Sequence, residues 1–291
     1  MTFHGSLVAI ITPFRNGTVD EKALGDLIEW QIANGTDGIV PCGTTGESAT
    51  LTHEEHKRVI EFTIEAVKRR VPVIAGTGSN ATDEAIEFTR HARSAGADAA
   101  LLISPYYNKP TQEGLYRHHK AIAEAVDIPQ ILYNIPGRTA VNMAPATVAR
   151  LATLKNIVGI KEGAGSLQQV SEIVQACGDR FTVLAGDDAL TLPMMAVGAT
   201  GVITVTANVA PAEMAAMVDA WEAGNVAGAR ALHFKLYPLF QALFFETNPV
   251  PVKHALALMG KATADVRLPL CAMSQENLDK LTRVMKDYGL V

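Results

Sequence analysis

One lysine in this sequence stands where it could act as a nucleophile. Lys161 follows the apolar run Ile157–Ile160, which is typical of a strand covered on both faces, so its side chain would rise through an apolar interior. Burial disfavours an ammonium ion and lowers its pKa, and a neutral amine can attack a ketone to form an imine. Two simpler interpretations stay open from position alone. Lys161 pairs with Glu162 or Asp187, or it reaches the solvent.

Hydroxyl groups and one arginine follow other predicted strands. Thr44 and Thr45 lie between two glycines, where backbone N–H groups and hydroxyls can converge on a small carboxylate. Tyr107 and Tyr133 end different strands, and phenols there can pass protons between substrate and solvent, although packing at the rim is the simpler interpretation. Arg138, in the loop that follows, can bind a second carboxylate through two parallel hydrogen bonds, whereas many loop arginines are only solvated.

The sequence offers little for metal, phosphate or nucleotide chemistry. All eight histidines fall in predicted helices or near the N-terminus, and none ends a strand. Asp187 and Asp188 form a poor metal site by themselves, because tandem aspartates more often cap a following helix. The segment 76–80 lacks a GxGxxG or Walker continuation. We therefore expect no metal ion, and phosphorylated substrates are disfavoured.

Composition and charge exclude further classes of protein. The 291 residues carry a net charge of −5 with acids and bases interspersed, which argues against nucleic acid and anionic membranes as partners. No stretch approaches the roughly 20 apolar residues of a membrane span. The opening MTFHGSLVAIITPF has no basic region and predicts a strand rather than a signal peptide. Three widely spaced cysteines without a CxxC pair fit a reducing cytoplasm.

Short apolar runs alternate with longer segments of helical period along the chain. Continuous rather than alternating hydrophobicity predicts eight strands of a parallel sheet, at 7–14, 38–42, 72–78, 99–107, 129–136, 157–163, 181–188 and 201–206. Helices are predicted at 21–34, 52–69, 82–95, 112–126, 145–153, 166–177, 189–197 and 211–223. Thr52 and Glu55 form a capping box at the start of one of them, and glycines in NGTDG, AGADA and VGATG end others.

Eight successive strand–helix units predict a (β/α)₈ TIM barrel, with a doubly wound open sheet as the alternative. Segments 225–245, 250–260 and 274–288 predict a C-terminal helical extension. We therefore expect a catalytic barrel over 1–224 and a helical domain over 225–291. In such barrels the active groups lie at the C-terminal ends of the strands, where the residues described above stand.

Three motifs in this order resemble the dihydrodipicolinate synthase and N-acetylneuraminate lyase superfamily. They are Gly43-Thr44-Thr45-Gly46-Glu47, then Tyr133-Asn134-Ile135-Pro136 with Arg138 and Thr139, and Gly159-Ile160-Lys161-Glu162. The resemblance runs from the opening GSLVAIITPF to NPVPVKHAL near the C-terminus. Together these motifs are far more specific than any one of them.

The resemblance implies a class I reaction, in which pyruvate forms a Schiff base on Lys161 and condenses with L-aspartate-4-semialdehyde in diaminopimelate and lysine biosynthesis. It places the pyruvate carboxylate on Thr44 and Thr45 and the second carboxylate on Arg138. A proton relay would consist of Thr44, Tyr133 and Tyr107, the last from a neighbouring subunit. Gly186 and Ile203 would line the pyruvate pocket.

The resemblance also implies an assembly and an effector. It suggests a homotetramer built as a dimer of dimers, with no metal and no diffusible cofactor. Allosteric L-lysine would bind to a set of seven residues, Ser48, Ala49, His53, His56, Asn80, Glu84 and Tyr106. Without the resemblance, we would place His53 and His56 on the solvated face of a helix.

The sequence departs from the family pattern at two positions, and three alternative functions are to be weighed against the synthase. Ala164 stands where a small hydroxyl residue is more usual, and Thr204 where serine is expected. A sister lyase acting on a sugar acid would share Lys161 and Tyr133, but Arg138 with Tyr107 favours the synthase. A non-catalytic barrel that binds a small acid is disfavoured because nucleophile, relay and clamp are all intact. A metal-dependent aldolase is the least favoured.

Overall fold

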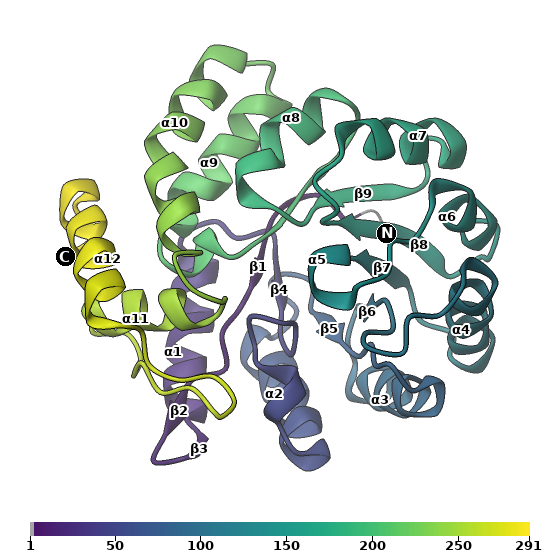
Figure 1. The fold of residues 1–291 in the computed structure, drawn as a ribbon, viewed down its shortest axis with the longest axis horizontal. Helices are drawn as coiled ribbons and strands as arrows, with labels where there is room; N and C mark the ends of the chain where they lie inside the picture. Colours follow the sequence, from purple (N-terminus) through teal and green to yellow (C-terminus); the bar gives the residue numbers. More distant parts are fainter. Residues whose placement is uncertain (1–2) are drawn as a thin grey trace. The chain divides into compact units, whose positions relative to one another are not determined.

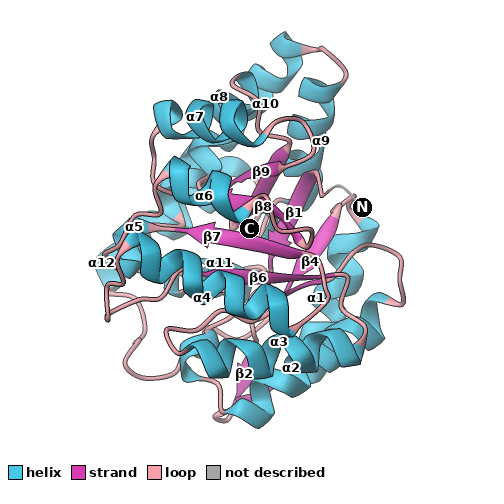
Figure 2. Ribbon diagram, turned by 90° about the vertical axis from the view of Figure 1, so that its right-hand side faces the viewer, coloured by secondary structure: helices cyan, strands magenta, loops and turns pink. Residues whose placement is uncertain are grey.

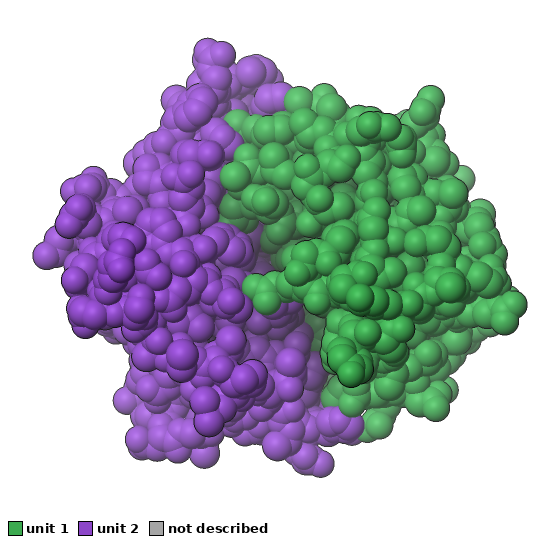
Figure 3. All heavy atoms as spheres, viewed as in Figure 1, with its two compact units in different colours: residues 1–5, 72–203 green, residues 6–71, 204–291 purple. Residues whose placement is uncertain are grey.

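The computed structural model describes residues 3–291. These residues divide into two compact units, shown in different colours in Figure 3. One unit contains residues 72–203 with the segment before residue 6, and the other contains residues 6–71 and 204–291. This division does not follow the predicted boundary at residue 224, which stays a prediction. Within the described residues, no helix is both long and apolar enough to cross a membrane.

The first unit alternates parallel strands with helices. Each of its strands pairs with the next one along the chain. They are β5 (Ile74–Gly76), β6 (Ala99–Ile103), β7 (Gln130–Asn134), β8 (Ile157–Glu162), β9 (Thr182–Ala185) and β10 (Gly201–Thr204), of which the last residue belongs to the other unit. Its helices are α3 (Thr82–Ala95), α4 (Gln112–Ala125), α5 (Pro136–Thr139), α6 (Pro145–Leu151), α7 (Leu167–Cys177) and α8 (Thr191–Ala196), with the 3₁₀ turn η2 (Asp188–Leu190). Figures 1 and 2 show α3, α4, α6 and α7 as a row along the outer side of the strands.

Burial explains why these strands are mainly apolar. Residues of α3, β6, α4 and the segment after α4 form a cluster in which each side chain is at most 4% exposed, consisting of Ala85, Ala100, Leu102, Ile122, Val126 and Ile128. A strand whose outer face packs on helices cannot carry the alternating polar side chains of a half-exposed sheet. The continuous apolar runs of the sequence therefore predicted a helix-covered parallel sheet correctly.

The second unit contains the other strands and the C-terminal helices. Strand β1 (Gly5–Ala9) pairs in parallel with β4 (Gly38–Val40), and β2 (Phe14–Arg15) forms a short antiparallel hairpin with β3 (Thr18–Val19). The helices are α1 (Glu21–Ala33), α2 (His53–Val67), α9 (Pro211–Glu222), α10 (Val226–Ala242), α11 (Val250–Leu258) and α12 (Gln275–Tyr288). Two 3₁₀ turns, η1 (Ser48–Thr50) and η3 (Thr206–Asn208), complete it.

The helix boundaries follow the local signals in the sequence. The Thr52 hydroxyl accepts a hydrogen bond from the Glu55 N–H at 3.2 Å, and the Glu55 carboxylate accepts one from the Thr52 N–H at 2.9 Å. This confirms the predicted capping box of α2. Gly96 ends α3 in the left-handed conformation, with φ +98°, as the glycine in AGADA predicted.

The order of elements confirms the eight predicted strand–helix units, although each strand is shorter than its apolar run. Besides the short 3₁₀ turns η1 and η3, two features were not predicted. The hairpin β2–β3 is too short to leave a periodic signal, and the single helical turn α5 contains Arg138, which we expected in an irregular loop. Pro136 at its first position explains that turn, because proline has the φ of a helix and lacks an N–H that would go unpaired there.

Candidate active site

Lys161 and Tyr133 lie opposite each other at the C-terminal ends of β8 and β7. The parallel register pairs Tyr133 with Lys161, and the lysine Nζ lies 4.4 Å from the centre of the tyrosine ring. Lys161 is only 6% exposed, so the interpretation that it reaches the solvent is wrong. Gly159 allows β8 to approach β9 closely, since a Cβ there would lie 2.6 Å from the Thr182 carbonyl oxygen.

Burial sets the protonation of this lysine. Desolvation lowers the pKa of Lys161 to about 8, while the negative charge of Asp188 raises it and the positive charge of Arg138 lowers it further. The alternative in which Lys161 pairs with Glu162 is also not supported. The Glu162 carboxylate instead accepts hydrogen bonds from Asn134, Ala164 and Gln169. The sequence argument for a neutral amine at strand β8 is therefore supported by the burial of the site.

Arg138 and Tyr107 line one open cavity of about 670 Å³, together with Tyr106, Lys109, Thr139 and Ala140. Arg138 lies on α5 with its side chain exposed, so the guanidinium is accessible to an anion from solution. Tyr107 is 89% exposed and has a φ of +73°, an unfavourable conformation for a residue with a Cβ. The structure thus brings together the predicted clamp and one member of the predicted relay.

The two residues predicted to line the pyruvate pocket lie in and next to the two strands that come after β8. Ile203 lies in β10 and is 1% exposed. Gly186 follows β9, and its N–H donates to the Glu162 carbonyl at 2.8 Å. A Cβ at Gly186 would come within 3.0 Å of that same oxygen, so the close approach requires glycine.

Thr44 and Thr45 lie in a tight turn of the second unit. The Gly46 N–H donates to the Gly43 carbonyl at 3.1 Å, and the Thr12 hydroxyl donates to the Gly46 carbonyl at 2.7 Å. Thr45 is buried, and its hydroxyl accepts a hydrogen bond from the Asn248 side chain at 3.0 Å. The turn is therefore fixed by contacts with Thr12, in the segment that follows β1, and with Asn248, in the C-terminal part of the chain.

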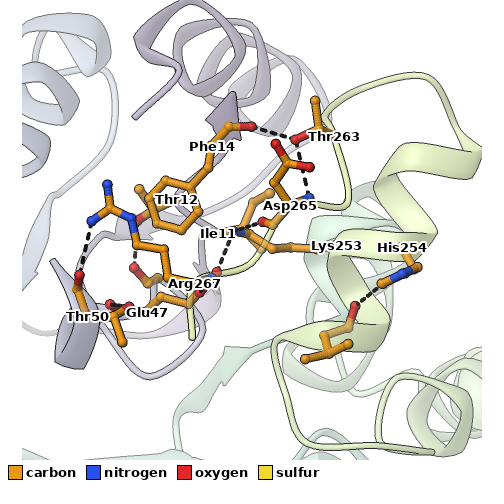
Figure 4. A network of polar contacts seen from close by, with 12 residues as sticks. Ile11, Thr12, Phe14, Glu47, Thr50, Lys253, His254, Thr263, Asp265 and Arg267 are labelled. Atoms are coloured by element: carbon orange, nitrogen blue, oxygen red, sulfur yellow. Dashed lines mark hydrogen bonds and ion pairs between the residues drawn. The ribbon is translucent and has the colours of Figure 1, made fainter. Parts of the chain in front are cut away.

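A buried ion pair anchors the end of this turn, and the sequence analysis did not find it. The ammonium of Lys253 on α11 contacts the carboxylate of Glu47, and their side chains are 0% and 1% exposed (Figure 4). Lys253 also donates to the Asp265 carbonyl at 2.8 Å, and Glu47 accepts from the Arg267 N–H at 3.1 Å. Glu47 has a left-handed φ of +54°, which these contacts maintain. The local signal was a lysine inside the apolar segment 250–258.

The residues assigned by resemblance to an L-lysine site fall in both units. In the first unit, the Asn80 side chain donates to the Tyr106 carbonyl at 3.2 Å, and Ser79 donates to the Glu84 carboxylate nearby. In the second unit, Ser48 and Ala49 form η1, while His53 and His56 lie on α2. His53 is exposed and His56 is 4% exposed, so the two are not equally solvated.

The two departures from the family pattern have structural roles. The Ala164 N–H donates to the Glu162 carboxylate at 2.6 Å, a contact that uses its backbone and not its side chain. The Thr204 hydroxyl accepts from the Ala207 N–H at 3.2 Å, which a serine hydroxyl would do equally well. Across residues 3–291, no cluster of three or more His, Cys, Asp or Glu side chains has the arrangement of a metal site.

A buried lysine at a strand end, facing a tyrosine and lying in one unit with an exposed arginine, is the arrangement of an enzyme that forms an imine with a small keto acid. The model of the dihydrodipicolinate synthetase family matches residues 2–288. The chain is 65% identical to the 4-hydroxy-tetrahydrodipicolinate synthase of Syntrophus aciditrophicus and 64% identical to that of Geotalea uraniireducens, over 99% of this chain and at least 99% of each relative. It belongs to the dihydrodipicolinate synthetase family.

Solved structures confirm the predicted (β/α)₈ barrel. The dihydrodipicolinate synthase of Aquifex aeolicus superposes with a TM-score of 0.98 at 54% identity, covering 99% of both chains. The chloride-inhibited enzyme of Acinetobacter baumannii, solved with pyruvate, has a TM-score of 0.98 at 48% identity over 100% of both chains. The enzyme of Cyanidioschyzon merolae, solved with lysine bound, has a TM-score of 0.97 at 41% identity over 99% of both chains.

The burial of Lys161 predicts how imine formation depends on pH. The neutral amine is the nucleophile, and its pKa is lowered from 10.5 to about 8, so the rate of imine formation should rise with pH, reach half its maximum near pH 8 and level off above. Trapping with pyruvate and cyanoborohydride between pH 6 and 10, followed by mass spectrometry, measures this rate. Asp188→Asn should move the rise to lower pH, because the carboxylate raises the pKa of Lys161. A rise centred near pH 10.5 would contradict the assignment.

The buried ion pair of Glu47 predicts a large loss of stability in Lys253→Met. The substitution leaves a buried carboxylate without its cation, which typically costs about 3–5 kcal/mol of the free energy of unfolding. Urea denaturation followed by circular dichroism measures the loss. Lys280→Met, which removes an exposed ion pair with Glu276 on α12, is the matched control and should change stability little. The double variant Glu47→Met with Lys253→Met should recover part of the loss; equal losses in single and double variants would contradict the pairing argument.

Proposed function

We propose that this chain catalyses the reaction for which its relatives are named, as a 4-hydroxy-tetrahydrodipicolinate synthase that condenses pyruvate with L-aspartate-4-semialdehyde. The observation that carries the proposal is Lys161, a buried amine with a lowered pKa at the end of β8, facing Tyr133. Relatives at 65% and 64% identity bear this name. We accordingly place the reaction in diaminopimelate and lysine biosynthesis, as the resemblance implies. The wider family includes lyases of sugar acids, and Arg138 with Tyr107 favours the synthase over them.

The proposed chemistry needs only the lysine and the substrates. The neutral Lys161 amine attacks the ketone carbon of pyruvate, water leaves, and the resulting iminium ion withdraws electrons from the methyl carbon. Loss of a methyl proton gives an enamine, whose carbon attacks the aldehyde of the second substrate. The amino group of that substrate then displaces Lys161 from the imine carbon and closes the ring. No metal and no diffusible cofactor take part in this scheme.

We assign a role to side chains of each unit by itself. In the second unit, the turn at Thr44 and Thr45 is assigned to binding a carboxylate. In the first unit, Gly186 and Ile203 are assigned to the lining of a pocket for pyruvate. Arg138 binds the carboxylate of the semialdehyde, since an exposed guanidinium can hold a carboxylate through two hydrogen bonds. Thr44, Tyr133 and Tyr107 move protons between the reacting atoms and the solvent.

Tyr107 supports the further proposal that the active form is an oligomer. A tyrosine that is 89% exposed and held at φ +73° presents a large amphipathic surface in a strained conformation. Such strain is usually maintained where a residue has a specific role. We infer that Tyr107 enters the active site of a neighbouring subunit, in a homotetramer built as a dimer of dimers.

The three free cysteines, Cys42, Cys177 and Cys271, suit the reducing cytoplasm in which we place the enzyme.

The first test of the proposed function identifies nucleophile and substrate together. Treatment with pyruvate and borohydride should add the mass of one reduced pyruvate per chain, on the peptide that contains Lys161. Turnover with a panel of aldehydes should then select L-aspartate-4-semialdehyde over sugar-derived aldehydes. The other buried lysine, Lys253, is the internal control and should stay unmodified because it is paired with Glu47. An adduct on Lys253, or none at all, would show that the mechanism is wrong.

The second test concerns action in trans. Lys161→Ala and Tyr107→Phe chains should each have little activity, and mixing them should restore part of it. A mixed dimer contains one site with both an intact lysine and an intact partner tyrosine. Activity measured after the two chains are unfolded and refolded together, beside each chain treated alone, gives the result. If hetero-dimers form completely and no activity is recovered, each chain supplies its own tyrosine.

The third test concerns L-lysine as an effector. The structure from Cyanidioschyzon merolae has lysine bound, and this chain has suitable groups at Ser48, Ala49, His53, His56, Asn80, Glu84 and Tyr106. We expect millimolar L-lysine to inhibit turnover, because coupling between an effector site and a functional site typically amounts to about 1–3 kcal/mol. Added pyruvate should not relieve this inhibition, because the two ligands bind at separate sites. Glu84→Ala should weaken the inhibition by removing the partner of the ammonium. Full activity in millimolar L-lysine would refute the effector site and leave the catalytic proposal intact.

A further inference from the structure

Glu162, the residue after the nucleophile, is at the centre of a buried network on the other face of β8. Side chains alternate along a strand, so Glu162 points away from the face that Lys161 occupies. It is 1% exposed. Its Oε1 accepts from the Ala164 N–H at 2.6 Å, its Oε2 from the Gln169 side chain at 3.0 Å, and both from the Asn134 Nδ2 at 3.2 and 3.0 Å.

Asn134 continues this network into the segment that contains Arg138. It is opposite Glu162 in the β7–β8 register and is fully buried. Its Oδ1 accepts from the Met143 N–H at 2.9 Å, and its Nδ2 also donates to the Asn142 Oδ1 at 2.8 Å. Asn142 in turn exchanges two hydrogen bonds with Gln169 on α7, at 2.8 and 3.1 Å. The far end of segment 135–143 is thereby attached to β7, β8 and α7.

The same segment is also closed internally. The Thr139 hydroxyl shares its hydrogen between the Ile135 carbonyl at 3.1 Å and the Val141 carbonyl at 2.9 Å. The Arg138 N–H donates to the Ile135 carbonyl at 3.0 Å. Segment 135–143 begins directly after Asn134 and returns to the Asn134 side chain at Met143. The position of Arg138 relative to Lys161 therefore depends on how Asn134 is held against β8.

A carboxylate suits the position of Glu162 because the surrounding groups are donors. Burial raises the pKa of Glu162, while hydrogen bonds from Asn134, Ala164 and Gln169 lower it. Both oxygens must accept, and a carboxylate accepts at both, whereas an amide accepts at one and donates at the other. A glutamine here would direct an NH₂ group against at least one donor, which leaves buried polar groups unsatisfied.

We propose that Glu162 and Asn134 are positioning residues for the second substrate, because they fix the segment that carries Arg138 against the strand that carries Lys161. This proposal rests on the function proposed above, in which Arg138 binds the carboxylate of the semialdehyde. It assigns the pair no part in forming the imine. Their effect acts through the placement of the guanidinium.

The test measures two half-reactions separately in the Glu162→Gln variant: imine formation with pyruvate, and reaction of the bound pyruvate with the semialdehyde. Misplacement of a binding group by about 1 Å can cost up to about 100-fold in rate, so kcat/KM for the semialdehyde should fall by about 10- to 100-fold, mainly through KM. The limiting rate of imine formation with pyruvate at high pH should match wild type. Arg138→Ala is the reference and should show the same separation, with its imine profile moved to higher pH because the guanidinium lowers the pKa of Lys161. Glu172→Gln, the same change at an exposed position on α7, should leave both half-reactions unchanged.

A second variant tests whether the donor–acceptor match is the cause. Asn134→Asp combined with Glu162→Gln exchanges the amide and the carboxylate across the same pair of positions and keeps the net charge. It should recover most of the KM lost in Glu162→Gln, with a coupling that two independent sites would not show. The pyruvate adduct on each variant shows that the chain is folded.

Three outcomes would overturn the positioning role. They are a KM for the semialdehyde that is unchanged in Glu162→Gln, equal losses in both half-reactions, and a shift of the imine pH profile to lower pH, which would mean that the charge of Glu162 acts on Lys161 directly. The proposed function fails separately. Wild-type enzyme that forms the pyruvate adduct and does not consume the semialdehyde would refute the substrate assignment, whatever the variants do.

Discussion

The parallel register of β7 against β8 is the constraint on which the active site depends. It sets Tyr133 opposite Lys161 on one face and Asn134 opposite Glu162 on the other. Because side chains alternate, a shift by one residue would exchange the two faces and move the nucleophile out of its apolar setting. The buried hydrogen bonds between Asn134 and Glu162 oppose such a shift, since they would be lost with it. One register therefore maintains both the reacting pair and the polar network behind it.

Two buried lysines show how the surroundings decide what an amine does. Desolvation lowers the pKa of both Lys161 and Lys253. Beside Lys253, the Glu47 carboxylate opposes that shift and accepts the ammonium, so the residue is a fixed part of the turn's support. Lys161 instead faces the ring of Tyr133, and the charges of Asp188 and Arg138 act on its pKa in opposite directions. Lys161 is thereby an amine with a pKa of about 8, whereas Lys253 is held in an ion pair with Glu47.

The sequence predicted those features that leave a local pattern. Continuous apolar runs and the capping box at Thr52 located the strands and helices. The strand ends placed Lys161 and Tyr133 at one edge of the sheet, where the register sets them opposite each other, and their reactive roles stay a prediction. The contacts that hold these groups were not predictable in the same way. Glu47 and Lys253 are separated by 206 residues, and nothing in the segment around either one indicates its partner. Glu162 was considered only as a partner of its neighbour Lys161, whereas strand alternation turns it to the opposite face.

The charged and the buried groups of the site divide the proposed reaction between them. Imine formation needs a desolvated amine, and Lys161 and Tyr133 are accordingly 6% and 5% exposed on adjacent strands. Capture of a charged aldehyde needs a cation that solvent can reach, and Arg138 is exposed beside Tyr107 in the open cavity. The guanidinium also lowers the pKa of Lys161, so one charge favours the neutral nucleophile before pyruvate reacts and attracts the second carboxylate afterwards. The charge of Arg138 thus acts on the first step, and in the proposed reaction its placement acts on the second, which is why the buried polar network that holds its segment bears on capture of the aldehyde.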